Sequence, residues 1–295
     1  MEVPLTTRLT TVAAATVLTA GALLLAACTP APLPGAAGDP DPFGHVHAIA
    51  PDGAGVLLGT HTGIYRVDEE GEAAGPVGGY DFDAMGFTVS GGAWFASGHP
   101  GPSTPPELGA PNLGLIRSID AGETWEPVAF TGTEDFHLLT ADPAGTLYGI
   151  GSTLPSLRIS TDGGASWTDG AALAGVAGLA ATAEAVYAAT EGGLQTSTDG
   201  GVTFVPVPDA PLLYTVAAAD QTLAGVDTDG TVWRLSAATA TWEQVGTAAG
   251  RVQAIAATGD GTVLLVDDRG IARLGPAPDE TTILRPATAS TGEHP

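Results

Sequence analysis

The chain has 295 residues, with 33 Asp or Glu, nine Arg and no Lys, so its formal charge at pH 7 is −24. Binding to nucleic acid, or to anionic lipid through a basic patch, needs clustered Lys or Arg, so this composition excludes both. Apolar residues make up 44% of the chain, which is enough for a core, while 42 Gly and 23 Pro indicate many turns. Few charges and many short apolar runs between turns predict an all-β protein.

The first 28 residues have the features of an export signal. Arg8 is the only positive charge before an apolar stretch over residues 11–27, which is too short and too rich in Ala and Thr to predict a membrane-spanning helix. The stretch ends in Leu25-Ala26-Ala27-Cys28, and Cys28 is the only cysteine. This ending resembles the lipobox of bacterial lipoproteins, which implies cleavage before Cys28 and a diacylglycerol on its sulfur. The alternative is an ordinary signal peptide with an incidental cysteine.

We therefore expect a signal peptide over residues 1–27, a lipid anchor at Cys28 and a location on the outer face of the cell membrane. Residues 28–43 are rich in Pro, and such a tether reaches roughly 45 Å when extended. Residues 286–295 are expected to form a disordered tail. The predicted globular domain then covers residues 44–285.

Three segments of this domain share the pattern Ser-x-Asp-x-Gly-x-Thr/Ser-aromatic, and their first residues are 42 and 37 positions apart. This spacing is the length of one four-stranded propeller blade. The pattern residues are Ser118, Asp120, Gly122 and Trp125 in the first segment, Ser160, Asp162, Gly164 and Trp167 in the second, and Ser197, Asp199, Gly201 and Phe204 in the third.

The pattern resembles the Asp-box, or bacterial neuraminidase repeat, of sialidase-like β-propellers. The resemblance implies that each box joins the third and fourth strands of a blade at the outer rim. Its physical role is structural, because Asp and Ser cap the amides of a tight turn, Gly takes a positive φ, and the aromatic residue packs between sheets. A worn fourth copy ends in Thr241-Trp242.

Counting strands around these boxes predicts a β-propeller of six four-stranded blades, with a count of seven left open. The fourth strand of the last blade comes either from residues 281–284 or from the N-terminal stretch, which would then close the ring. The six units begin near His45, Asp81, Asp135, Val176, Leu212 and Arg251.

Polar side chains gather where three adjacent inner strands begin. Residues i and i+2 of a strand point the same way, so each pair of polar residues faces one side. The pairs are His45 and His47, Asp81 and Asp83, Asp135 and His137, and, on the last blade, Arg251 and Gln253. The alignment allows a slip of one or two residues and uses the apolar anchors Ile49, Met85, Leu139, Leu179, Val216 and Ile255.

Loops after the second strands add His61 and His99 to the same face, and a long Pro-rich loop over residues 100–112 lies beside them. Convergent polar groups in a concave mouth indicate a binding or catalytic pocket, so these five histidines are predicted to contact a ligand. The alternative is that the His and Asp residues pair with one another and cap strand ends.

Imidazole suits zinc and copper, with carboxylate as a second choice. The sequence therefore suggests a transition-metal site, with ligands from His45, His47, His61 and His137 and a carboxylate from Asp135. Asp81 and Asp83 would then orient the imidazoles through their free N–H groups. If the mouth is instead catalytic, Asp81, Asp83 and Asp135 are the candidates for acid–base work.

Segments around residues 81–87, 97–101, 113–115 and 135–137 also resemble bacterial lipoproteins that are labelled glycosyl hydrolase or exo-sialidase-like. Sialidases of that superfamily hold a substrate carboxylate with three inner arginines and use a Tyr/Glu pair with an Asp acid. Here only Arg251 lies on an inner strand, and no Glu accompanies Tyr214. Five arginines fall instead on third strands, away from the channel: Arg66, Arg117, Arg158, Arg234 and Arg273.

The sialidase mechanism is therefore poorly supported, and two hypotheses follow. The first is a membrane-anchored propeller that binds a small ligand, a glycan or a protein at its His/Asp mouth. The alternative is a glycoside hydrolase that acts on surface glycans. Because a fold does not fix a function, we favour the binding protein.

Overall fold

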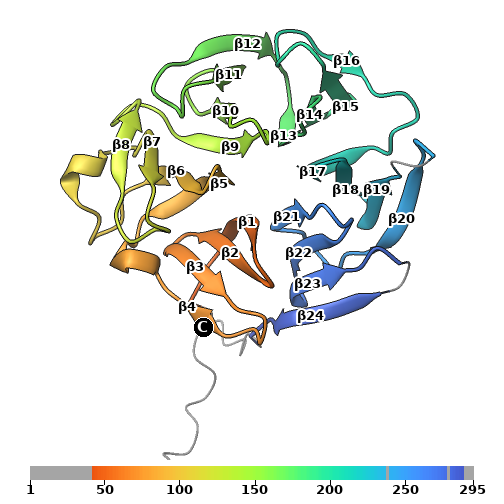
Figure 1. Cartoon of the computed structure of the whole chain (residues 1–295), viewed down its shortest axis with the longest axis horizontal. Helices are drawn as coiled ribbons and strands as arrows, with labels where there is room; N and C mark the ends of the chain where they lie inside the picture. Colours follow the sequence, from red (N-terminus) through yellow and green to blue (C-terminus); the bar gives the residue numbers. More distant parts are fainter. Residues whose placement is uncertain (1–41, 237–238, 278–279, 289–295) are drawn as a thin grey trace, which may run out of the picture. The chain divides into compact units, whose positions relative to one another are not determined.

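The computed structural model describes residues 42–236, 239–277 and 280–288. These residues form six four-stranded antiparallel sheets arranged as blades around a central axis, which is a β-propeller (Figure 1). The predicted all-β fold and the count of six blades are confirmed. The expected signal peptide, Cys28 and most of the tether and tail lie outside the described residues. Within the part that the structure describes, no helix has the length and apolar character needed to cross a membrane.

Each blade uses four consecutive strands, and the first strand of each lies nearest the axis (Figure 1). Blades 1 to 3 contain β1 (Val46–Asp52), β2 (Gly55–Thr60), β3 (Gly63–Val67), β4 (Ala73–Ala74), β5 (Asp83–Ser90), β6 (Ala93–His99), β7 (Leu115–Ser118), β8 (Glu126–Ala129), β9 (Phe136–Ala141), β10 (Leu147–Gly151), β11 (Ser156–Ser160) and β12 (Thr168–Ala172). Blades 4 to 6 contain β13 (Val176–Ala181), β14 (Val186–Thr190), β15 (Gly193–Ser197), β16 (Val205–Pro206), β17 (Leu213–Ala219), β18 (Thr222–Asp227), β19 (Thr231–Leu235), β20 (Trp242–Thr247), β21 (Ala254–Ala257), β22 (Val263–Asp267), β23 (Gly270–Leu274) and β24 (Thr281–Pro286).

The second strands form the centre of the core. All six residues of β2 and all five of β22 are buried, because neighbouring blades cover both faces of each strand. For the same reason these strands have nearly continuous apolar sequences rather than an alternating pattern. Side chains from adjacent blades pack into shared clusters, such as Leu57 of β2 with Phe82 and Phe87 of blade 2.

Within the described residues, β24 supplies the fourth strand of blade 6 and completes the last sheet of the ring. Val46 of blade 1 packs with Val266 and Ile271 of blade 6. Its backbone N–H also donates to Oε1 of Gln253 at 2.9 Å. At the outer side, Nη1 of Arg285 donates to the carbonyl oxygen of Gly71 at 2.7 Å. Of the two predicted ways to complete the last blade, the structure uses residues 281–286.

The three pattern segments join third and fourth strands at the outer rim, in blades 2, 3 and 4. In the second, the Ser160 hydroxyl donates to Asp162 at 2.9 Å and accepts from the N–H of Gly164 at 2.9 Å. Gly164 has a φ of +90°, a conformation that favours glycine. The other two turns repeat these contacts within 0.2 Å. The aromatic residues pack against their neighbours, and Trp167, for example, stacks on Phe136 with ring centroids 5.1 Å apart.

Inner strands carry a β-bulge near their start, where one residue is left out of the pairing with the second strand. A bulge redirects the side chain of the extra residue. The bulged residues are His47, Met85, His137, Ala177 and Tyr214, in blades 1 to 5.

The bulges correct the alignment of blade 2. Met85 is equivalent to His47 and His137, and the residue equivalent to Ile49 is Phe87. Asp83 therefore occupies the position of His45 and Asp135, and Asp81 lies before the strand. The sequence alignment was shifted by two residues in this blade because Met85 is apolar and resembles an anchor.

Candidate functional site

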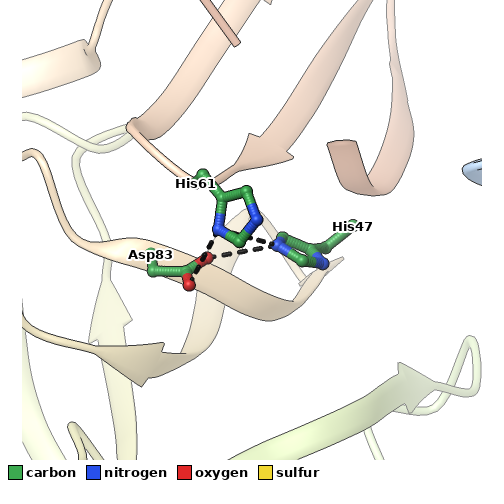
Figure 2. Close-up of side chains that lie close together, drawn as sticks. All are labelled: His47, His61 and Asp83. Carbon is green, nitrogen blue, oxygen red and sulfur yellow. Dashed lines mark hydrogen bonds and ion pairs between the residues drawn. The ribbon is translucent and has the colours of Figure 1, made fainter. Parts of the chain in front are cut away.

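A first cluster joins blades 1 and 2. Its members are His47 at the bulge of β1, His61 in the turn between β2 and β3, and Asp83 at the start of β5. Nε2 of His47 lies 3.2 Å from Oδ1 of Asp83, and Nδ1 of His61 lies 2.9 Å from Oδ2. The two ring nitrogens are 3.4 Å apart. Figure 2 shows both imidazoles turned toward the carboxylate.

The turn that carries His61 is held in place by its neighbours. The Thr60 hydroxyl donates to the carbonyl oxygen of Gly63 at 2.8 Å and accepts from the N–H of Thr62. The backbone N–H of His61 donates to the carbonyl oxygen of His45 at 3.0 Å. A Cβ on Gly63, whose φ is +118°, would lie 2.3 Å from the carbonyl oxygen of Tyr80. The position of the His61 backbone is thus fixed before any ligand binds.

The electrostatics of the first cluster favour an ionised Asp83. Burial raises the pKa of this carboxyl, but the contacts with His47 and His61 lower it by more, so the pKa lies below its usual value. Oδ1 of Asp83 is buried and has no hydrogen-bond donor among the described residues, although Nε2 of His47 lies 3.2 Å away. The carboxylate therefore keeps an unused lone pair beside two imidazole nitrogens.

A second cluster joins blades 2 and 3. His99 ends β6, Asp135 immediately precedes β9, and His137 is the bulged residue of β9. Nε2 of His99 and Nε2 of His137 lie 3.2 and 2.7 Å from the same oxygen, Oδ2 of Asp135. The Asp135 side chain is 2% exposed, whereas both imidazoles are about half exposed. This carboxylate is a buried acceptor that holds two imidazoles at the surface.

The two clusters repeat one contact. In each, the histidine at or just after the end of a blade's second strand touches the carboxylate at or just before the start of the next inner strand: His61 with Asp83, and His99 with Asp135. In blades 4 to 6 the carboxylate position holds Gly175, Leu212 and Arg251. Among the described residues, the His/Asp arrangement is therefore confined to blades 1 to 3.

Two predicted residues lie beside the clusters. Asp81 accepts hydrogen bonds from the N–H of Ser103, at 3.0 and 2.9 Å, and from the Thr104 hydroxyl. It thus fastens the loop after β6. The ring of His45 contacts that of His47 edge-on, with centroids 4.8 Å apart. Burial, and then the positive charges of His47 and Arg251, lower the pKa of His45.

Sequence reasoning missed Glu134. Its side chain is 1% exposed and lies 3.3 Å from Nη2 of Arg158. Oε1 of Glu134 accepts from the N–H groups of Thr153 and Asp135 at 3.1 and 3.2 Å. Arg158 is on a third strand as predicted, but it reaches inward to this carboxylate. The Glu-Asp pair directly before a strand was the signal in the sequence.

The clusters flank one end of a central cavity of about 480 Å³. All six inner strands line this cavity, and each predicted apolar anchor contributes to its wall. His47, His137 and Gln253 line it at the end where the inner strands begin. We call this end the mouth.

No protein-family model and no curated protein matches the chain. Among solved structures, the chain is similar to a GH74 xyloglucanase from Xanthomonas campestris, with 17% identity, a TM-score of 0.53 and coverage of 82% of this chain and 45% of that one. It is also similar to the extracellular domain of a hybrid two component system from B. thetaiotaomicron, with 13% identity, a TM-score of 0.50 and coverage of 81% and 33%. The chain spans less than half the length of either, and the likeness shows the β-propeller fold alone.

Proposed function

We propose that this chain is a lipid-anchored propeller outside the cytoplasm that binds a ligand at the mouth formed by blades 1 to 3. The observation that carries the proposal is the pair of His–Asp clusters at equivalent positions of two adjacent blade interfaces. They place four imidazoles, three of them about half exposed and all backed by carboxylates, around one end of a cavity. Convergent polar groups around a concave opening are typical of ligand sites.

Binding is a better use of these carboxylates than glycoside hydrolysis. A glycosidase needs a carboxylic acid that stays protonated until it donates to the leaving group, and a second carboxylate that reaches the sugar. The pKa of Asp83 is lowered rather than raised. Asp135 is 2% exposed, and Asp81 is engaged by a loop. These features suit carboxylates that hold imidazoles.

The test combines binding with product release. The full chain is titrated with soluble oligosaccharides, short peptides and divalent cations, and the oligosaccharide mixtures are then analysed for new reducing ends. We expect saturable binding of one probe class, its loss in a His99→Ala/His137→Ala or an Asp83→Asn variant, and no cleavage. The rim variant Asp162→Asn serves as the control that keeps binding. Cleavage that depends on Asp83 or Asp135 would favour the hydrolase, and binding that ignores all mouth variants would contradict the proposal.

The membrane anchor is supported by the lipobox-like sequence that ends at Cys28. Replacement of Cys28 by Ser removes the sulfur that would carry the lipid. We expect Cys28→Ser to accumulate as an unprocessed precursor or to leave the membrane fraction, as seen by fractionation and gel mobility. Retention of a mature-size Cys28→Ser species in the membrane would overturn the anchor.

A further inference from the structure

We propose that Nε2 of His47, Nδ1 of His61 and the carboxylate of Asp83 form a site for one transition-metal dication, zinc or copper. The inference rests on the proposed function, because it names the ligand of one part of the mouth. Among the described residues, these three are the one set of His, Cys, Asp or Glu whose ligating atoms all lie within 4.8 Å of one another.

The separations of the ligating atoms match a tetrahedral centre. Zinc binds imidazole nitrogen at about 2.0–2.1 Å and carboxylate oxygen at about 2.0–2.2 Å, so two ligands at a tetrahedral angle are about 3.3–3.5 Å apart. The two imidazole nitrogens are 3.4 Å apart, and the His47 nitrogen is 3.2 Å from Oδ1 of Asp83. The His61 nitrogen is 2.9 Å from the other oxygen, Oδ2, so the carboxylate faces the two imidazoles with both of its oxygens. An ion can enter with shifts of a few tenths of an ångström.

The three groups also have the right chemistry. Two imidazoles and one carboxylate are a ligand set that zinc, copper and ferrous iron accept in proteins. When these two nitrogens carry no proton, neither of them can donate a hydrogen bond to the other or to the carboxylate. A dication instead accepts a lone pair from both imidazole nitrogens and from the carboxylate. The buried Oδ1 of Asp83, which has no hydrogen-bond donor among the described residues, is the atom that a cation would satisfy.

The backbone holds these ligands before metal arrives. His47 is fixed by a strand bulge, His61 by the Thr60 turn and Asp83 by the start of β5. Rigid elements of this kind position metal ligands better than mobile loops do. His61 is 48% exposed and His47 12%, so the set is closed on the protein side and open toward solvent. Three protein ligands with one open position are the arrangement that leaves room for water or an organic ligand.

This set differs from the one expected from sequence. His47 and His61 belong to both sets, whereas Asp83 is a third ligand here and was expected to orient the imidazoles through their free N–H groups. His137 instead contacts Asp135 in the second cluster, and His45 packs against the ring of His47. In the second cluster the ligating atoms of His99, Asp135 and His137 do not all lie within 4.8 Å of one another, so these three groups do not surround a common point.

The experiment uses the full chain after chelator treatment and dialysis. Calorimetry with ZnCl₂ and CuCl₂ is expected to show one ion bound per chain. His61→Ala removes a direct ligand and is expected to weaken binding by more than about 100-fold, the upper range for loss of a supporting partner. His99→Ala, the equivalent substitution in the next blade, removes none of the three ligands, so the affinity is expected to stay within about threefold.

A spectroscopic measurement distinguishes the loss of a metal ligand from a folding defect. Cobalt(II) bound by imidazole and carboxylate in a tetrahedral site gives visible d–d bands, and the nearly isosteric Asp83→Asn variant should lose them while its circular dichroism stays unchanged. Wild-type protein that binds no zinc or copper, or a His99→Ala variant that loses as much affinity as His61→Ala, overturns the metal site. If the metal site fails but peptides or oligosaccharides still bind through His99 and His137, the proposed function stands. If no probe of any class binds, both fail.

Discussion

The two His–Asp clusters use the same residue types at consecutive blade interfaces, yet only the first surrounds a common point. In the first, the bulged imidazole and the turn imidazole both come from blade 1, and the carboxylate comes from blade 2. In the second, blade 2 has Met85 at the bulge, and the additional imidazole, His137, comes from the carboxylate's own strand. Both clusters contain two His and one Asp, so the residue types do not explain the difference. The three ligand atoms converge where the bulged imidazole comes from the blade before the carboxylate.

The largest predicted effect concerns the support of the second cluster. Glu134→Ala leaves the guanidinium of Arg158, which is 15% exposed, without its buried partner. Loss of one member of a buried ion pair costs about 3–5 kcal/mol, so urea unfolding of Glu134→Ala should show a decrease of that size. The matched control is Glu126→Ala, which breaks an exposed pair with Arg117 and should cost at most about 1 kcal/mol. Equal costs would mean that the Glu134 network does not stabilise blade 3.

The next largest effect is a zinc-dependent rise in Tm, which distinguishes a metal ion in the first cluster from one in the second. A ligand that binds only the folded state adds about 2.7 kcal/mol at a concentration one hundred times its Kd. For a domain of this size that is roughly 5–11 °C in Tm. Zinc should produce this shift in the wild type and in His137→Ala, and none in His61→Ala. A zinc-dependent shift that survives in His61→Ala and disappears in His137→Ala would assign the ion to the second cluster.

The smallest predicted effect is on the pH dependence of stability, and it arises from Asp162 in a turn at the outer rim rather than from either cluster. Hydrogen bonds from the Ser166 side chain, the Ser166 backbone and the Ser160 hydroxyl lower the pKa of Asp162 from 3.8 to about 2. A carboxyl with a lowered pKa stabilises the fold above its unfolded pKa, and this contribution is lost as the pH falls from about 4 toward 2. Asp162→Asn should therefore show a shallower loss of stability over that range in acid unfolding. An unchanged slope would show that the turn does not hold an ionised Asp162.

Much of the fold follows from local sequence. The Ser-x-Asp-x-Gly pattern marks a turn whose hydrogen bonds are made within eight residues, so its spacing predicts blade length and, with it, six blades. The face that carries the polar residues is also predictable, since residues i and i+2 share a side of a strand. His47, at the start of an inner strand, lines the cavity at the end that this rule indicates.

The grouping of the site residues could not be predicted in the same way. A bulge inserts one residue with no sequence signal of its own, so strand periodicity alone assigns Met85 as an anchor and pairs Asp81 with Asp83, whereas Met85 is the bulged residue. Contacts such as His61 with Asp83 also cross between blades, where strand periodicity gives no information. Glu134 was missed because its partner, Arg158, lies on a different strand and its inward reach depends on the side-chain conformation.

The claim that the bulged imidazole completes the metal site is tested most directly by adding one. Met85 lines the cavity at the position equivalent to His47, and the blade that holds it already supplies His99 opposite Asp135. Calorimetric zinc titration should give one ion per chain for the wild type and two for Met85→His, with unchanged circular dichroism. One ion in both proteins, or none in the wild type, would contradict the account.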